Sequence, residues 1–127
     1  MSTRKIIMPE SLTKPRAPLS HAVKVGNLVF VSGTTPFKPG SRDMAPEFEG
    51  QMHQVMQNIK VILEEAGSSL DKVVKANIIL IDIDNFQKMN EIYRSYFREG
   101  NYPARTTIQA PLAVTGMLLE IECVAEI

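Results

Sequence analysis

An arginine and a glutamate near the carboxyl end of the chain are the residues best suited to chemistry. Arg105 lies in segment 102–111 and Glu120 in segment 118–124, and both segments alternate apolar and polar residues as β-strands do. The six residues 111–116 between them suit a hairpin loop. A guanidinium can grip a carboxylate through paired hydrogen bonds, while a nearby glutamate can move a proton or orient water.

The register of this predicted hairpin decides which side chains meet. With the loop at 111–116, Thr107 would face Glu120, and Arg105 would face Glu122 with Glu120 one diagonal step away. A slip of one residue would instead put Arg105 and Glu120 on opposite faces of the sheet. We choose the first register because it gathers an apolar face. Its members are Thr106, Ile108, Leu119 and Ile121. A cross-strand salt bridge without a functional role is the alternative interpretation of the pair.

Composition narrows the class of protein. The chain has 127 residues, with 14 Lys and Arg against 14 Asp and Glu, so we expect one domain, 1–127, and no broad basic surface for nucleic acid. No apolar run approaches the roughly 18 residues of a membrane span. The single cysteine, Cys123, cannot form an intramolecular disulfide and is expected to be buried. These features favour a cytoplasmic protein with neither a membrane nor a nucleic-acid partner.

Metal chemistry has few candidate ligands in this chain. His21 and His53 are far apart, and no cluster of Cys and His has the spacing of metal ligands. The glycines are scattered, so none forms a phosphate-binding loop. We therefore expect no metal ion and no phosphate-binding loop.

Apolar periodicity predicts the order β-β-β-α-β-α-β-β. The expected strands are 4–8, 21–25, 28–32, 72–81, 102–111 and 118–124, and the expected helices are 46–66 and 84–97. Gly26-Asn27 predicts a tight hairpin turn, and Gly67 predicts the end of the first helix. The apolar face of that helix keeps a period of 3.6 residues. Its members are Phe48, Met52, Val55, Met56, Ile59, Ile62, Leu63 and Ala66.

The second helix carries two polar features of interest. Asp84 followed by Gln87 has the spacing of a capping box. Asn90 interrupts the apolar face between Phe86 and Tyr93, and a buried amide left without partners costs about 1–3 kcal/mol. We interpret Asn90 as a structural hydrogen-bonding residue in preference to a direct ligand contact.

The strand at 72–81 is apolar on both faces, although two helices can cover only one face of the sheet. One face carries Val74, Ala76, Ile78 and Leu80, and the other carries Val73, Ile79 and Ile81. The uncovered face must be buried in another way, which in a chain of this length implies an oligomer. Arg105 and Glu120 would then lie near a subunit boundary, where pockets commonly form.

Five blocks of the sequence resemble the signatures of the RidA/YjgF family of reactive intermediate (enamine/imine) deaminases. They are PART at 103–106, LEIECVA at 119–125, VGNLVFVSG at 25–33, EAGSSL at 65–70 and MNEIY at 89–93. The resemblance implies an α+β, chorismate-mutase-like two-layer subunit with a mixed six-stranded sheet and two helices on one face. It also implies a homotrimer with clefts between subunits.

The resemblance also implies roles for individual residues. Arg105 matches the arginine that grips the substrate carboxylate, and Glu120 matches the glutamate that positions and activates water. Four further residues match positions around the cleft. These are Thr107, through its backbone, and Ser32, Gly33 and Asn90. The implied reaction is the cofactor-independent hydrolysis of 2-imino acids, of the 2-iminobutanoate and 2-iminopropanoate type, to 2-oxo acids and ammonia.

The sequence departs from the family at two positions that bear on the pocket. Leu19 stands where many members have tyrosine, and His21 stands where many have glutamine. A more apolar or roomier pocket suits a larger enamine, such as an aminomuconate-type intermediate. Two other classes remain open: a non-catalytic regulator that binds small carboxylates, and an endoribonuclease or translation inhibitor, against which the neutral net charge argues.

Overall fold

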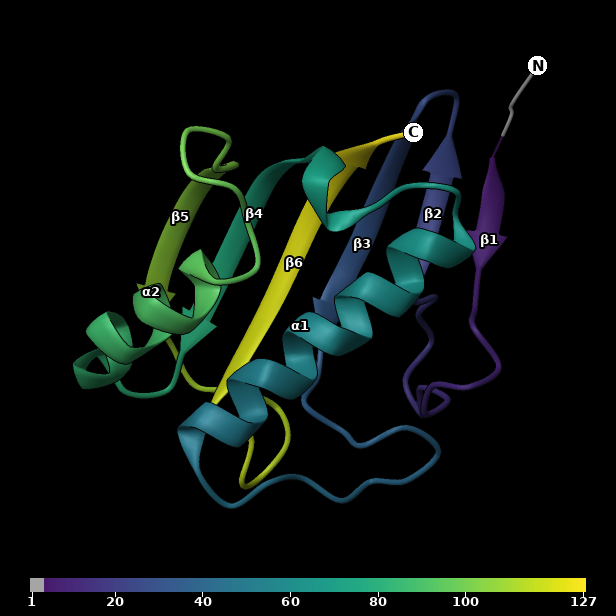
Figure 1. Ribbon diagram of the computed structural model, residues 1–127. Coiled ribbons are helices and arrows are strands. Elements are labelled where there is room, and N and C mark those ends of the chain that lie inside the picture. Colours follow the sequence, from purple (N-terminus) through teal and green to yellow (C-terminus); the bar gives the residue numbers. More distant parts are fainter. Residues whose placement is uncertain (1–3) are drawn as a thin grey trace.

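The computed structural model describes residues 4–127 as one mixed sheet with two helices on the same face (Figure 1). The strands are β1 (Lys5–Ile7), β2 (Ala22–Val25), β3 (Leu28–Thr34), β4 (Val73–Leu80), β5 (Ala104–Gln109) and β6 (Leu119–Glu126). Their order across the sheet is β1-β2-β3-β6-β4-β5, and only the β4–β5 pair is parallel. The predicted α+β subunit with a six-stranded mixed sheet is confirmed.

Helix α1 (Phe48–Glu65) forms the main cover of the sheet and packs against β3 and β6. Every apolar residue of its predicted face is buried, together with Ala66 at its end. Gly67 follows with φ +86°, a conformation that glycine adopts without steric cost and that commonly ends helices. The local pattern was therefore sufficient to predict this helix and its boundary.

The predicted hairpin between the last two strands is wrong. Strand β4 lies between β5 and β6, with Ala76 paired to Arg105 on one side and to Cys123 on the other. Helix α2 (Phe86–Arg94) connects β4 to β5, as a helical crossover connects parallel strands. This topology puts the doubly apolar strand β4 inside the sheet, where both of its edges are hydrogen-bonded.

A register shift in β4 changes one predicted face. The pairing with β6 is irregular between Val73 and Lys75. As a result Val73 is buried beneath the helices, whereas Val74 is exposed, the reverse of the predicted assignment. The extra residue of a bulge reverses the alternation on one side of it.

The predicted capping box at the second helix is also wrong. A short 3₁₀ turn, Ile83–Asn85, precedes α2, and the Asp82 carboxylate accepts a hydrogen bond from the Asp84 backbone N–H at 2.9 Å. Asn85 is the N-cap of α2 and makes no side-chain capping bond. The polar cap therefore belongs to the turn and not to the α-helix.

Candidate functional site

Arg105 and Glu120 lie on opposite faces of the sheet within one subunit. Arg105 pairs with Ala76, which is buried beneath the helices, whereas Glu120 pairs with Ile79, three residues further along β4 and therefore on the other face. Paired residues share a face and successive residues alternate between faces. The expected contact of Arg105 with Glu122 and Glu120 therefore does not exist in the subunit.

The Arg105 guanidinium packs against helix α2. Its carbon lies 5.0 Å from the centre of the Tyr93 ring and 5.8 Å from that of Phe86, and Nη1 lies 3.9 Å from the Met89 sulfur. The cation–π contacts hold the planar guanidinium in place, and they leave its N–H groups without an oxygen acceptor in the described part of the chain. Among residues 4–127 no carboxylate forms a salt bridge with Arg105, so its donors are available to a planar anion.

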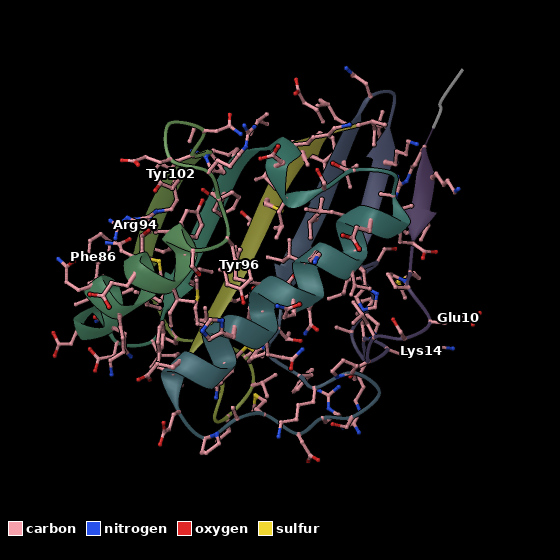
Figure 2. The ribbon with its side chains drawn as sticks, in the orientation of Figure 1. Glu10, Lys14, Phe86, Arg94, Tyr96 and Tyr102 are labelled. Atoms are coloured by element: carbon pink, nitrogen blue, oxygen red, sulfur yellow. The ribbon has the colours of Figure 1, made fainter. Side chains whose placement is uncertain are left out.

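A cavity of about 240 Å³ adjoins this arginine and is called the Arg105 cavity below. It is lined by Asn90, Tyr93, Arg94, Tyr102 and Arg105. Figure 2 shows Arg94 and Tyr102 at the β5 end of the sheet, far from Lys14 at the opposite end. The cavity therefore belongs to one end of the molecule.

Three buried polar atoms in and beside this region have no hydrogen-bond partner within the described residues. They are Asn90 Oδ1, the Tyr93 hydroxyl and Thr107 Oγ1. The structural hydrogen bond expected of Asn90 is thus not made through its oxygen. Burial raises the pKa of Tyr93 to about 12, against an opposing effect of Arg105, so its hydroxyl stays protonated at neutral pH. Buried polar groups are normally satisfied, so these three atoms are exceptions within the described residues.

Glu120 lines a second cavity, of about 420 Å³, called the Glu120 cavity below. Ser32, Gly33, Leu19 and His21 line it as well, so this cavity collects most of the remaining predicted site residues. The Ser32 hydroxyl donates to the Ser20 carbonyl at 2.6 Å and is therefore already engaged. Leu19 is 48% exposed and lies at the rim.

Gly33 makes room for the Glu120 side chain. A Cβ on residue 33 would lie 2.6 Å from Cδ of Glu120, closer than real Cβ contacts. Strand β3 is irregular in its pairing with β6 between Val31 and Thr34, which brings the Gly33 backbone beside the carboxylate. Gly33 therefore acts on the site by lacking a side chain.

The environment of Glu120 favours its protonated form. Burial raises the pKa of the half-buried Glu120 carboxyl, and the nearby negative charge of Glu122 raises it further. Glu122 itself accepts a hydrogen bond from Asn77 Nδ2 at 2.9 Å. A carboxyl with a raised pKa both takes and returns protons more readily near neutral pH.

His21 is fixed beside this cavity in a defined orientation. Its Nε2 lies 3.1 Å from the Thr13 carbonyl oxygen, which can only accept, so Nε2 carries the hydrogen. Within residues 4–127 no group of three or more His, Cys, Asp or Glu side chains could hold a metal ion. Across the same residues, no helix has the length and apolarity needed to cross a membrane.

Comparison with known proteins assigns the family. Residues 10–127 match the Endoribonuclease L-PSP family, which includes the RidA, YjgF and RutC proteins. The chain belongs to this family. A RutC family protein of Pyrococcus abyssi is 41% identical over 123 residues, covering 96% of both chains. The resemblance to the RidA/YjgF family is thereby confirmed.

Two further relatives bear on activity. A protein of Arabidopsis thaliana named Reactive Intermediate Deaminase A, chloroplastic, is 36% identical, covering 96% of this chain and 65% of the relative. The crystal structure of E. coli TdcF with bound serine superposes with a TM-score of 0.89 at 27% identity, covering 97% of this chain and 98% of TdcF. Family membership and the first of these relatives support a general role as a deaminase of reactive intermediates.

Proposed function

We propose that the protein hydrolyses 2-imino acids and their enamine tautomers to 2-oxo acids and ammonia, in clefts between the subunits of a homotrimer. The observation that carries this proposal is the separation of Arg105 and Glu120, each beside its own cavity. Each cavity holds half of the required chemistry. Assembly that brings the Arg105 cavity of one subunit against the Glu120 cavity of its neighbour would complete a site.

The exposed face of the sheet supports assembly. Ile6, Phe30 and Ile108 lie on the face opposite the helices and are each about half exposed. Exposed apolar area of this kind is typical of a surface that a second chain covers. A homotrimer would have about three times the 14.2 kDa mass of the chain.

The proposed reaction needs only binding, water and proton transfer. Arg105 holds the substrate carboxylate by paired hydrogen bonds. Glu120 takes a proton from water as the water oxygen bonds to the imine carbon, and that proton passes to the imine nitrogen, which gives a carbinolamine. Glu120 then takes the hydroxyl proton and delivers it to the amino group, so that the carbonyl forms, the carbon–nitrogen bond breaks and ammonia leaves with the 2-oxo acid as the second product. The bound serine of TdcF supports an amino-acid-like carboxylate as the ligand of this fold.

Three other interpretations give different experimental results. A larger enamine substrate, such as an aminomuconate-type compound, would be turned over in place of short imino acids. A carboxylate-binding regulator would bind 2-oxo acids without releasing ammonia. An endoribonuclease, the activity that the family description names, would degrade RNA. The cytoplasmic location stays a prediction, because relatives are named as chloroplastic and mitochondrial.

The test is ammonia release from freshly generated 2-imino acids and enamines, compared with spontaneous hydrolysis in buffer, with RNA degradation measured in parallel. We expect ammonia release well above the spontaneous rate and no loss of RNA. Binding of 2-oxo acids without any acceleration would contradict the enzymatic proposal in favour of the regulator.

A further inference from the structure

The Glu120 cavity extends well past the residues assigned to the reaction. Beyond Glu120, Ser32 and Gly33, its wall is made largely of apolar side chains from separate segments of the chain. They are Leu12, Leu19, Phe37, Ile62, Val114 and Met117. We call this part of the cavity the apolar lobe. Leu12, Phe37, Ile62 and Met117 are all buried, so the wall belongs to the packed structure of the subunit.

Two buried amides on α1 hold the loops that form the apolar lobe. Asn58 Nδ2 donates to the carbonyls of Thr35 and Phe37 at 3.0 and 2.9 Å, which fixes the loop after β3. Gln51 Nε2 donates to the Gly116 carbonyl at 2.9 Å, and Gln51 Oε1 accepts from the Leu118 N–H at 2.8 Å. Both loops are therefore anchored to the same helix, and the lobe exists before any ligand binds.

The size and lining of the lobe indicate what it binds. At about 420 Å³ the whole cavity falls within the range of roughly 300–1,000 Å³ of small-molecule sites, which are mostly apolar with few polar groups. A short imino acid would reach Glu120 and leave the apolar wall unused. Each methylene that enters an apolar pocket changes the specificity constant by about 10- to 200-fold.

We infer that the physiological substrate is a 2-imino acid with a bulky apolar side chain, branched aliphatic or aromatic, which occupies the apolar lobe. This inference rests on the proposed function, because it places the reacting imine beside Glu120. The substrate carboxylate would meet Arg105 of the neighbouring subunit, and the side chain would extend toward Phe37 and Ile62.

Basic side chains at the same cavity define the main competing substrate. Lys14, Arg16 and Arg42 also line it, and no carboxylate among residues 4–127 forms a salt bridge with them. A second substrate carboxylate could bind there. However, Lys14 and Arg16 are exposed, and the Arg42 guanidinium lies 4.3 Å from the centre of the Phe37 ring. The buried part of the wall is mostly apolar, with Thr34 and Asn58 as its polar members, and Asn58 is engaged with the carbonyls of Thr35 and Phe37, which favours an apolar side chain.

The test compares kcat/KM for four substrates: 2-iminopropanoate, 2-imino-4-methylpentanoate, 2-imino-3-phenylpropanoate and 2-iminopentanedioate. We expect at least one of the two bulky apolar substrates to exceed 2-iminopropanoate by about 10-fold or more. Ala113 is exposed and lines the cavity. Ala113→Phe should therefore lower the ratio of kcat/KM for the bulky substrate to kcat/KM for 2-iminopropanoate by a similar factor. Thr115→Phe, in the same loop but outside the lining, should leave the ratio unchanged.

A preference for 2-iminopropanoate, or an unchanged ratio in Ala113→Phe, would overturn this inference while leaving the deaminase proposal intact. A preference for 2-iminopentanedioate would assign selectivity to the basic side chains and overturn it too. Absence of ammonia release from all four substrates would reject the proposed function itself, and the substrate class with it.

Discussion

The two cavities differ in what they offer a ligand. The Arg105 cavity lies at the edge strand β5 and presents a cation that packs on aromatic rings and has no ion-pair partner among residues 4–127. The Glu120 cavity lies beside interior strands and presents an acid with a raised pKa within loops anchored by buried amides. The first can bind a carboxylate and the second can move a proton. Neither does both, so the proposed reaction would need a cavity from each of two subunits.

Removal of Arg105 should have the largest effect. We expect Arg105→Ala to reduce deamination to the spontaneous rate and to abolish 2-oxo acid binding, because alanine cannot replace the paired hydrogen bonds. The fold should persist, because within residues 4–127 the guanidinium forms no salt bridge. Arg105→Lys, a point charge, should recover little activity. Ammonia release and thermal unfolding measure the two effects, and wild-type turnover by folded Arg105→Ala would refute the assignment.

The Glu120 cavity should control turnover more than affinity. We expect Glu120→Gln to lower kcat by about 10²–10⁴-fold while 2-oxo acid affinity, measured by calorimetry, stays the same or improves. Glu122→Gln is the matched control, since Glu122 is hydrogen-bonded to Asn77, and it should change kcat little. If Glu122→Gln were the inactive variant, the catalytic carboxylate would have been misassigned.

Gly33→Ala should have an intermediate effect that acts through Glu120. The added Cβ would displace the carboxylate, and misplacement by about 1 Å can cost roughly 10²-fold in rate. We therefore expect kcat to fall by up to about 10²-fold with an unfolding temperature near that of the wild type. The double variant with Glu120→Gln should be no slower than Glu120→Gln alone. An additional loss in the double variant would show that Gly33 acts independently.

The pH dependence of stability should show the smallest effect. The pKa of Glu120 is higher in the folded than in the unfolded chain, so its ionisation opposes folding as pH rises above the ordinary carboxyl range. Glu120→Gln should therefore be slightly more stable than the wild type at pH 7. The difference should largely disappear near pH 4, below the ordinary glutamate pKa of 4.5. Urea unfolding of both proteins at pH 7 and pH 4 measures this difference in unfolding free energy. The same difference at both pH values would exclude a raised pKa for Glu120.

Features that depend on a local pattern of residues were predicted correctly from the sequence. The pairing of strands that are distant in the sequence was not. Helix α1 and the turn at Gly26 follow from apolar periodicity and glycine conformation, both of which are short-range signals. The position of β4 between β5 and β6 is a long-range outcome, and an adjacent pair of strands in sequence suggested a hairpin instead. The residue types at 105 and 120 indicated the chemistry of the site, but the predicted position of one residue relative to the other was wrong.

The wall of the Glu120 cavity could not have been predicted from the sequence. Leu12, Phe37, Ile62 and Met117 come from separate segments, and each resembles an ordinary core residue when taken alone. The amides that anchor the loops, Gln51 and Asn58, are buried polar residues on a helix whose periodic pattern is carried by its apolar residues. Asn90 illustrates the converse, because its polar side chain stands out in an apolar pattern, whereas its lack of a hydrogen-bond partner among residues 4–127 depends on the tertiary structure.

Mixing two inactive variants tests most directly whether one site draws Arg105 and Glu120 from different subunits. Arg105→Ala and Glu120→Gln chains would be co-expressed in equal amounts and purified together, and their ammonia release compared with that of each variant alone. In a cyclic trimer each mixed assembly restores one cleft, so random assembly should recover about a quarter of the wild-type activity. If co-assembled trimers stayed as inactive as the separate variants, the two residues would not meet across a subunit boundary, and the account would be wrong.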